Sequence, residues 1–379
     1  MVCGTRFGLC FVLVITACAS AERTGSAPTG GEATTANAID ARAFELSAGI
    51  VVAPSMGSVF VARPGGGIEA LDSTSGQPLW SSDEAARPLL AHGGRLLAQR
   101  ETGSGLPLAV LEAADGAALQ RFEVPLPEGA RAAIDESPEA RFTLSPRAAG
   151  GDVILEWEYL ERDALGVSPP GGRPFARREL GVLRVDLASG EATLVDPGAL
   201  PSADGELPPQ VERLVAAGEL RARPWRTDDL LVAAQQIYEP AGDRLVLRRW
   251  RAHTGEALPE VSLSAGRPVA VLPAADRRHL LVVTPLETAL GERHRYRWTI
   301  HSLATGTAVA ERRAERSASP FCIVRGMLLY LELPSGRRIE DRWEEMPLRL
   351  RALDPTSGDE LWHRAVRDPA FYGPAPPRP

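Results

Sequence analysis

The residue types that most often carry chemistry are spread along this chain without a catalytic spacing. The six histidines form no pair at metal-ligand spacing, so we predict no metal site and interpret them as turn or surface residues. They are His92, His253, His279, His294, His301 and His363. The chain contains no lysine, which excludes a lysine Schiff base, a P-loop lysine and a lysine general base. It also has no G-x-S-x-G elbow and no dinucleotide fingerprint after a strand-like run, so we expect a protein that is not an enzyme and holds no cofactor.

Three aspartates do recur at one spacing. Asp72, Asp186 and Asp354 each lie four residues before a glycine, and the residue just before that glycine carries a side-chain oxygen, as Ser75 and Ser357 do. Short oxygen-bearing side chains accept hydrogen bonds from the free N–H groups of tight turns. We therefore interpret these carboxylates as turn chemistry rather than as catalytic acids.

The glycines belong to one short sequence motif, which we call the phrase and which occurs six times. Its clearest copies read ALDSTSGQPLW at Ala70–Trp80 and RALDPTSGDELW at Arg351–Trp362. The turn glycines are Gly76, Gly116, Gly190, Gly255, Gly306 and Gly358. Eight residues before each glycine the side chain is apolar, and five before it only His301 breaks the apolar row; three after it, five of six copies are apolar. This pattern predicts a strand, a tight turn closed by a positive-φ glycine, and a second strand, with the apolar rows packed between repeats.

Two further strand-like runs precede the hairpins, such as GIVVAP and GSVFVAR before the first and SPFCIV and MLLYLEL before the last. The unit is therefore four strands, and the glycines are spaced roughly 40 to 75 residues apart, close to the repeat of about 40 to 50 residues of β-propellers. The sequence predicts an all-β chain, a β-propeller of six four-stranded antiparallel blades. A seventh blade remains open if the stretch between Gly116 and Gly190 contains a degenerate repeat.

The phrase ALD-x-x-[ST]-G-x-x-LW resembles the repeat of the PQQ-like (quinoprotein alcohol dehydrogenase-like) β-propellers. The resemblance covers residues from about Gly49 to Val366 and is strongest in the first and last copies. That family contains pyrroloquinoline-quinone enzymes and also cofactor-free scaffolds. Its quinone enzymes carry adjacent cysteines that form a disulfide beside the cofactor, and this chain has no such pair. We therefore favour a non-catalytic protein-binding scaffold, with an exported quinoprotein-type dehydrogenase or a small-ligand-binding propeller as the alternative.

The N-terminal residues have the pattern of an export signal. The apolar run over residues 7–17 is too short to span a bilayer as a helix. Its last residues, Ile-Thr-Ala directly before Cys18, resemble the lipobox of bacterial lipoproteins, in which the cysteine is lipidated and becomes the mature N-terminus. The resemblance implies a signal peptide at residues 1–17 and, because Ala19 rather than aspartate follows the cysteine, an outer-membrane lipoprotein facing the periplasm. The alternative is cleavage after Ala19 or Ala21, which would give a secreted protein.

Composition divides the rest of the chain. Residues 18–40 are rich in Ser, Thr, Gly, Ala and Pro and cannot bury enough apolar surface to fold, so we predict a flexible tether. The propeller is predicted to span residues 41–366 and a Pro-rich tail residues 367–379. Cys322 is then the one thiol of the propeller, and we expect it in the core. The formal net charge of −7 argues against nucleic-acid binding, so we expect a protein or peptide partner, with the membrane reached through the lipid anchor.

The predicted strand order places most of the irregular sequence on one face. Because the strands alternate in direction, the glycine turns lie on one face, and the second-to-third loops and the blade connections lie on the other. Long second-to-third loops are expected at Arg162–Leu180, Glu287–Arg295 and Pro334–Pro347. The candidate interaction residues in or beside them are Arg173, Phe175, Arg177, Arg178, Arg293, Arg295, Tyr296, Arg337, Arg338, Arg342 and Trp343. Arg and aromatic side chains are common in protein interfaces, so we predict a partner surface here; the alternative is a set of solvated loops neutralised by nearby Asp and Glu.

Overall fold

The computed structural model describes most of the chain between residues 42 and 367. The described residues are 42–101, 106–124, 141–149, 152–162, 175–196, 207–220, 223–227, 229–265, 267–286, 295–315, 318–339 and 342–367. The predicted signal peptide and tether, with Cys18, lie outside them, as do Arg173, Arg293 and all of the predicted tail beyond Arg367.

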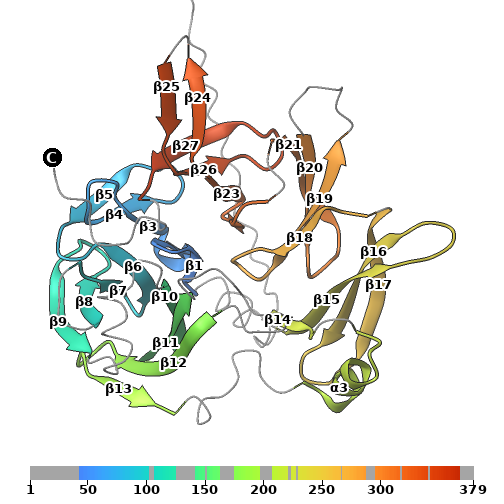
Figure 1. The fold of residues 1–379 in the computed structure, drawn as a ribbon, viewed down its shortest axis with the longest axis horizontal. Coiled ribbons are helices and arrows are strands. Elements are labelled where there is room, and N and C mark those ends of the chain that lie inside the picture. The colour runs from blue at the N-terminus through green and yellow to red at the C-terminus, as the bar shows by residue number, and fades with distance from the viewer. Residues whose placement is uncertain are drawn as a thin grey trace, which may run out of the picture.

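The strands form six antiparallel sheets that are arranged as the blades of a ring (Figure 1). Blade 1 contains β1 (Phe44–Ser47), β2 (Ile50–Ala53), β3 (Ser58–Ala62), β4 (Ile68–Asp72) and β5 (Pro78–Ser82), with the short 3-10 helix η1 (Pro54–Met56) between β2 and β3. Blade 2 contains β6 (Arg87–His92), β7 (Arg95–Gln99), β8 (Leu106–Glu112) and β9 (Ala118–Val124). Blade 3 contains β10 (Arg141–Ala149), β11 (Asp152–Arg162), β12 (Phe175–Asp186) and β13 (Ala192–Val195).

The second half of the ring repeats the same order. Blade 4 contains β14 (Trp225–Thr227), β15 (Leu230–Ile237), β16 (Arg244–Arg251) and β17 (Ala257–Ala265). Blade 5 contains β18 (Ala270–Pro273), β19 (His279–Leu286), β20 (Arg295–Ser302) and β21 (Ala308–Ala314). Blade 6 contains β22 (Phe321–Val324), β23 (Met327–Glu332), β26 (Arg349–Leu353) and β27 (Glu360–Ala365). A separate hairpin, β24 (Ser335–Ile339) and β25 (Arg342–Met346), lies between β23 and β26 in the chain, and helix α3 (Pro209–Ala216) precedes blade 4.

The predicted all-β propeller of six blades is confirmed, and the described residues add a fifth strand in blade 1 and the separate hairpin β24–β25. In blade 1 the extra strand β1 pairs with β2 and lies toward the middle of the ring (Figure 1). Leu46 of β1 packs into the core between blades 1 and 6, and the carboxylate of Glu45 lies 3.1 Å from Arg87 of blade 2. Burial raises the pKa of Glu45, and the facing Arg87 opposes that effect. The chain between Gly116 and Gly190 contributes its described strands to blades 2 and 3.

The glycine turns have the geometry that the phrase implies. All six glycines have φ between 67° and 78°, a region that residues with a Cβ avoid. In the first copy, the N–H of Gly76 donates to Asp72 O at 2.8 Å, and Asp72 Oδ1 accepts the N–H of Thr74 at 3.1 Å and of Ser75 at 2.8 Å. These hydrogen bonds hold the pKa of Asp72 below its usual value. Asp354 accepts the corresponding pair of N–H groups in the last copy.

At two seams, a tryptophan of one blade packs onto the turn glycine of the next. Trp362 of blade 6 lies against Gly76 of blade 1, and Trp80 of blade 1 lies against Gly116 of blade 2. The indole Nε1 of Trp362 donates to Ser73 O at 3.2 Å, and Trp80 makes the equivalent bond at 3.0 Å. The final tryptophan of the phrase therefore joins blades by packing and by a directed hydrogen bond.

The apolar residues three positions after the glycine do not pack between blades as predicted. Leu79 is 54% exposed and Leu361 is 48% exposed, because the fourth strand is the outermost strand of its blade. Side chains alternate along a strand, so only the following residue, Trp80 or Trp362, turns toward the next blade.

The core is divided among the seams of the ring. Five apolar clusters join blades 1 and 2, 2 and 3, 4 and 5, 5 and 6, and 6 and 1. A sixth packs α3 against blade 4, with Val211 of the helix beside Trp250. Gln210 of α3 donates to Thr254 O at 2.9 Å next to Gly255, so the helix occupies the position that the tryptophan of a preceding blade takes elsewhere.

The ring closes between blades 6 and 1 without exchanging a strand among the described residues, since each sheet is built from one stretch of chain. In the chain that follows β27, the N–H of Arg367 donates to Ala62 O of blade 1 at 2.9 Å. Cys322 is fully buried at this closure, as expected, and burial raises the pKa of its thiol. No helix in the described part of the chain is long and apolar enough to cross a membrane.

His301, the one break in the apolar row, is not the turn or surface residue that was predicted, because it lies on β20 and is buried as its apolar counterparts are. Its Nδ1 lies 3.1 Å from Gly306 O, so Nδ1 carries the proton that it donates to this carbonyl, across the hairpin turn. Burial lowers the pKa of His301, which favours the neutral imidazole that fits this apolar position.

Candidate functional site

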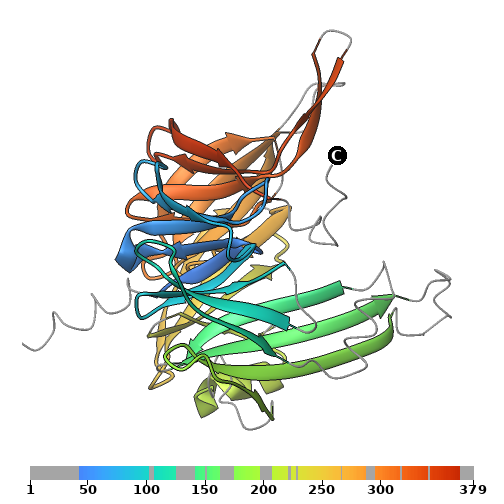
Figure 2. The ribbon, with the colours of Figure 1, turned by 90° about the vertical axis from the view of Figure 1, so that its left-hand side faces the viewer.

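The two faces of the ring are built differently. On the face of the glycine turns, which we call the turn face, the connections are short and several are bonded to the neighbouring blade. Asp276, between β18 and β19, accepts the N–H of Ile323 of blade 6 at 2.8 Å, and Arg325 donates to Pro54 O of blade 1 at 3.2 Å. On the opposite face, which we call the loop face, strands of blade 3 and the hairpin β24–β25 extend beyond the body of the ring (Figure 2). Loops positioned on a rigid scaffold are where proteins most often place binding residues.

The described ends of the first predicted loop, Arg162–Leu180, are strand, and residues 163–174 lie outside the described residues. β11 runs to Arg162 and β12 begins at Phe175, with Arg162 opposite Phe175 and Glu161 opposite Arg177. Phe175, Arg177 and Arg178 therefore stand on β12 and not in a loop, which corrects the prediction.

The predicted loop Pro334–Pro347 is also mostly strand, because it forms the hairpin β24–β25. Arg337 and Arg338 lie on β24, opposite Glu344 and Trp343 of β25, and Arg342 begins β25.

In the remaining loop, Glu287–Arg295, Arg295 and the adjacent Tyr296 begin β20, and Arg293 lies outside the described residues. The predicted residues that are described belong to blades 3, 5 and 6, so the fold places them on one face but on three separate blades.

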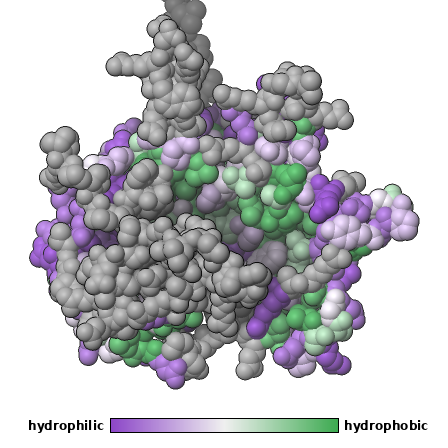
Figure 3. Space-filling model, in the orientation of Figure 1, coloured by the Kyte–Doolittle hydropathy of each residue, from purple (hydrophilic) through white to green (hydrophobic). Residues whose placement is uncertain are grey.

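Seen from the loop face, the molecule has apolar side chains toward its middle and hydrophilic ones around its rim (Figure 3). Exposed large apolar residues beside the loop-face ends of strands are Tyr238, Val269 and Leu333, and Leu180 is exposed in the middle of β12.

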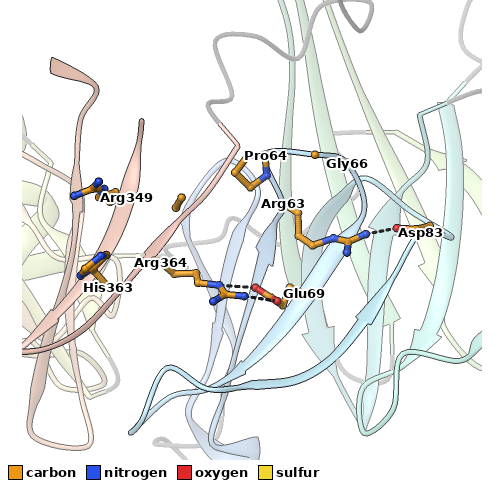
Figure 4. Close-up of a pocket in the computed structure, with 10 residues that line it drawn as sticks. Arg63, Pro64, Gly66, Glu69, Asp83, Arg349, His363 and Arg364 are labelled. Carbon is orange, nitrogen blue, oxygen red and sulfur yellow. Dashed lines mark hydrogen bonds and ion pairs between the residues drawn. The ribbon is translucent and has the colours of Figure 1, made fainter. Parts of the chain in front are cut away.

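A polar groove of about 690 Å³ lies on the loop face where blade 6 meets blade 1 (Figure 4). One wall is the end of β27 with Arg349 of β26, and the other is the turn between β3 and β4 with Asp83 after β5. The groove is lined by Arg63, Pro64, Gly65, Gly66, Glu69, Asp83, Arg349, His363, Arg364 and Ala365. Its volume is in the usual range for a ligand site.

Two ion pairs hold two arginines of the groove, Arg364 on the β27 wall and Arg63 on the opposite wall. Arg364 donates to both carboxylate oxygens of Glu69, from Nε at 2.8 Å and from Nη2 at 2.6 Å. Glu69 is only 8% exposed, and its hydrogen bonds raise the pKa of the Arg364 guanidinium. Arg63 pairs with Asp83 within the wall that the β3–β4 turn and Asp83 form. Gly67 is required here, because a Cβ would lie 2.6 Å from Ser82 O and 2.7 Å from the Asp83 carboxylate.

Arg349 adds a positive charge at the β27 wall, where His363 also lines the groove. The Nδ1 of His363 lies 2.7 Å from the carboxylate of Glu360. With Arg63 and Arg364 each facing a carboxylate, the groove as a whole carries an excess of cationic groups. Such a site can bind carboxylates or phosphates through charge-assisted hydrogen bonds.

The sequence did not predict this groove, because its walls come from opposite ends of the propeller and meet only when the ring closes. The one local signal is the run Gly65-Gly66-Gly67, which by itself indicates only a turn. No three His, Cys, Asp or Glu side chains converge on a possible metal position among the residues that the structure describes.

No protein-family model and no curated protein matches this chain. Among solved structures it is similar to BamB from Moraxella catarrhalis, at 13% identity and a TM-score of 0.29 over 73% of this chain and 79% of that one. It is also similar to a europium-containing methanol dehydrogenase, at 12% identity and a TM-score of 0.32 over 89% of this chain and 82% of that one. A third is quinohemoprotein alcohol dehydrogenase ADHIIG from Pseudomonas putida HK5, at 12% identity and a TM-score of 0.26 over 86% of this chain and 62% of that one.

The propellers expected from the PQQ-like repeat are thus among the similar structures. At this level of identity they bear on the fold alone, and the propeller itself is established by the sheet order of this chain.

Proposed function

We propose that this chain is an exported, lipid-anchored β-propeller that acts as a non-catalytic protein-binding scaffold at the cell envelope, with the partner held on the loop face. The observation that carries the proposal is the difference between the two faces. Short turns bonded across the seams make up one face, while paired strands extend from the other beside a cationic groove.

Extended strands suit this role better than flexible loops. Residues paired in β11–β12 and β24–β25 have already lost backbone freedom, so a partner that binds them orders little additional chain. The tether and the lipid on Cys18 would hold the ring near a membrane while leaving the loop face accessible.

The anchor is tested by Cys18→Ala in the full chain. We expect the wild-type protein to incorporate labelled palmitate and to partition into the detergent phase of Triton X-114, and the variant to do neither, because the cysteine thiol is the acceptor of the diacylglycerol group. Cys3→Ala, inside the predicted signal peptide, is the matched control and should behave as wild type. A Cys18→Ala protein that remains in the detergent phase would show that the anchor is elsewhere.

The partner surface is tested by photo-cross-linking in the source organism. A benzoylphenylalanine in place of Arg338 on β24 should give a discrete cross-linked protein, identified by mass spectrometry. The same substitution at Thr356, in a glycine turn of the opposite face, should give none. Equal cross-linking from both positions, or none from Arg338, would contradict the assignment of the loop face.

A further inference from the structure

The groove runs along the free edge of the last strand of the ring. β27 ends the sheet order β22-β23-β26-β27, so no described strand pairs with its outer edge. An exposed edge presents a row of backbone N–H and C=O groups to which an extended peptide can add as a further strand.

The side chains of the groove come from both sides of this edge. Trp362 faces blade 1, so Arg364, two residues on, faces the same way and meets Glu69. His363 alternates with them and faces the other side, as does Arg349, the pairing partner of Ala365. Figure 4 shows Arg349 and His363 on one side of the strand pair, and Arg364, Glu69 and Arg63 on the other. A groove that wraps an edge in this way matches the two alternating faces of an added strand.

We propose that this groove binds an extended, acidic segment of a protein partner, which pairs with the outer edge of β27 and places its carboxylates alternately on the two sides. The inference rests on the proposed scaffold function and identifies one site of contact within it. Carboxylates on one side reach Arg349 and His363, and those on the other reach Arg364 and Arg63.

Two carboxylates of the groove, the buried Glu69 and the exposed Asp83, pair with its arginines and orient them for such a ligand. Arg364 uses Nε and Nη2 on Glu69, and a guanidinium has five N–H donors, so donors remain for a second carboxylate. Arg63 makes a single ion-pair contact with the exposed Asp83, which also leaves donors for a ligand. Positioning of this kind lowers the side-chain entropy that binding would otherwise cost.

Gly65 is the glycine of this turn at which a larger side chain would enter the groove. Gly66 and Gly67 have φ of 94° and 79°, and Gly67 also lacks room for a Cβ, so the turn requires glycine at both positions. Gly65 has no positive φ, and a Cβ there would meet nothing within 4 Å. The fold therefore accepts other residues at position 65, whereas a large side chain there would stand in the groove. Position 65 therefore allows a substitution that fills the groove without disturbing the turn.

The test uses the full chain and a fluorescein-labelled octaglutamate peptide, with binding followed by fluorescence anisotropy. We expect saturable binding that Arg349→Glu and Gly65→Trp each weaken about tenfold or more. Two matched controls should stay within about twofold of wild type: Gly65→Ala, which adds only a methyl group, and Arg267→Glu, which makes the same charge change at an exposed arginine outside the groove. Circular dichroism checks that the variants are folded.

Three results would overturn the proposal. The first is an equal loss of binding in Arg267→Glu, which would mean general charge attraction. The second is equal binding of an octaglutamate peptide that is N-methylated at every residue, because it has no backbone N–H groups to pair with a strand edge. The third is undiminished binding by Gly65→Trp. Combining Gly65→Trp with the cross-linker at position 338 separates this proposal from the scaffold function. If the cross-link to the partner is retained while neither the wild type nor any variant binds the peptide, the scaffold function is supported and the groove is not the peptide site.

Discussion

Gly76→Ala and Gly116→Ala are each expected to lower the free energy of unfolding by about 3 to 5 kcal/mol, and Gly358→Ala by only about 1 to 2 kcal/mol. All three glycines have a positive φ, so each alanine carries the same backbone strain. At Gly76 an added Cβ would also lie 2.6 Å from the indole of Trp362, and at Gly116 it would lie 2.5 Å from the indole of Trp80. At Gly358 nothing lies within 4 Å, so strain acts there alone.

The measurement is urea-induced unfolding followed by circular dichroism, and a double-mutant cycle identifies the cause. Trp80→Ala removes the indole against which the Cβ of Gly116→Ala would collide. The double variant should therefore be more stable than the sum of the single losses predicts, by about 2 kcal/mol. Equal losses at Gly76, Gly116 and Gly358 would contradict the claim that tryptophan packing onto the turn glycines holds these seams.

Gly358 can serve as the control because no tryptophan packs against it at the seam between blades 5 and 6. Blade 5 has Ala310 at the position where blades 1 and 6 have tryptophan, four residues after the turn glycine. A small residue cannot reach the next turn, so the seam between blades 5 and 6 depends on other contacts. Asp276 supplies one of them through its hydrogen bond to Ile323.

The propeller could be predicted from the sequence because its basic unit is local. Each hairpin is specified by a glycine with positive φ, an oxygen-bearing residue before it and apolar residues at fixed distances, all within about a dozen positions. Copies of that unit therefore revealed the blades even where only Gly and one or two apolar residues persisted.

Strands that extend beyond the body of a blade were harder to recognise. β12 begins FARREL and β24 contains GRRI, and neither has the apolar alternation of a half-buried strand. The available signal was charge complementarity between paired positions, such as Glu161 opposite Arg177 and Arg337 opposite Glu344. That signal becomes visible only once the register is known, since the pairing partners lie several residues apart across a turn.

The groove could not be predicted from the sequence for a related reason. Glu69 and Arg364 are separated by nearly the whole propeller and meet only because the last blade packs against the first. Nothing within either segment alone indicates an ion pair. Ring closure thus creates a cationic groove from residues whose local sequences describe only strands and turns.

Asp276→Ala is expected to lower the free energy of unfolding by about 3 to 5 kcal/mol, because its carboxylate is 5% exposed and serves both its own turn and the next blade. It accepts the N–H of Arg278 at 2.7 Å, the N–H of His279 at 3.2 Å, the Nδ1 of His279 at 2.8 Å and the N–H of Ile323 at 2.8 Å. Alanine would leave these donors without their partner at the seam between blades 5 and 6. The turn itself depends on this support, because Arg277 is held at a φ of 57° that a non-glycine residue rarely adopts.

Asp354→Ala is the matched control, since Asp354 also accepts two turn N–H groups but lies at the surface and reaches no other blade. The loss of unfolding free energy in Asp354→Ala should be several-fold smaller than in Asp276→Ala. The loss in Asp276→Asn, which keeps one acceptor oxygen, should fall between those of the two alanine variants. Hydrogen exchange at the Ile323 amide gives a local readout: we expect it to accelerate in Asp276→Ala and to stay unchanged in Asp354→Ala. If both alanine variants lose the same stability, Asp276 is a turn residue like the others, and the seam between blades 5 and 6 is held by its apolar cluster and by the backbone bond from Ala275 N–H to Phe321 O.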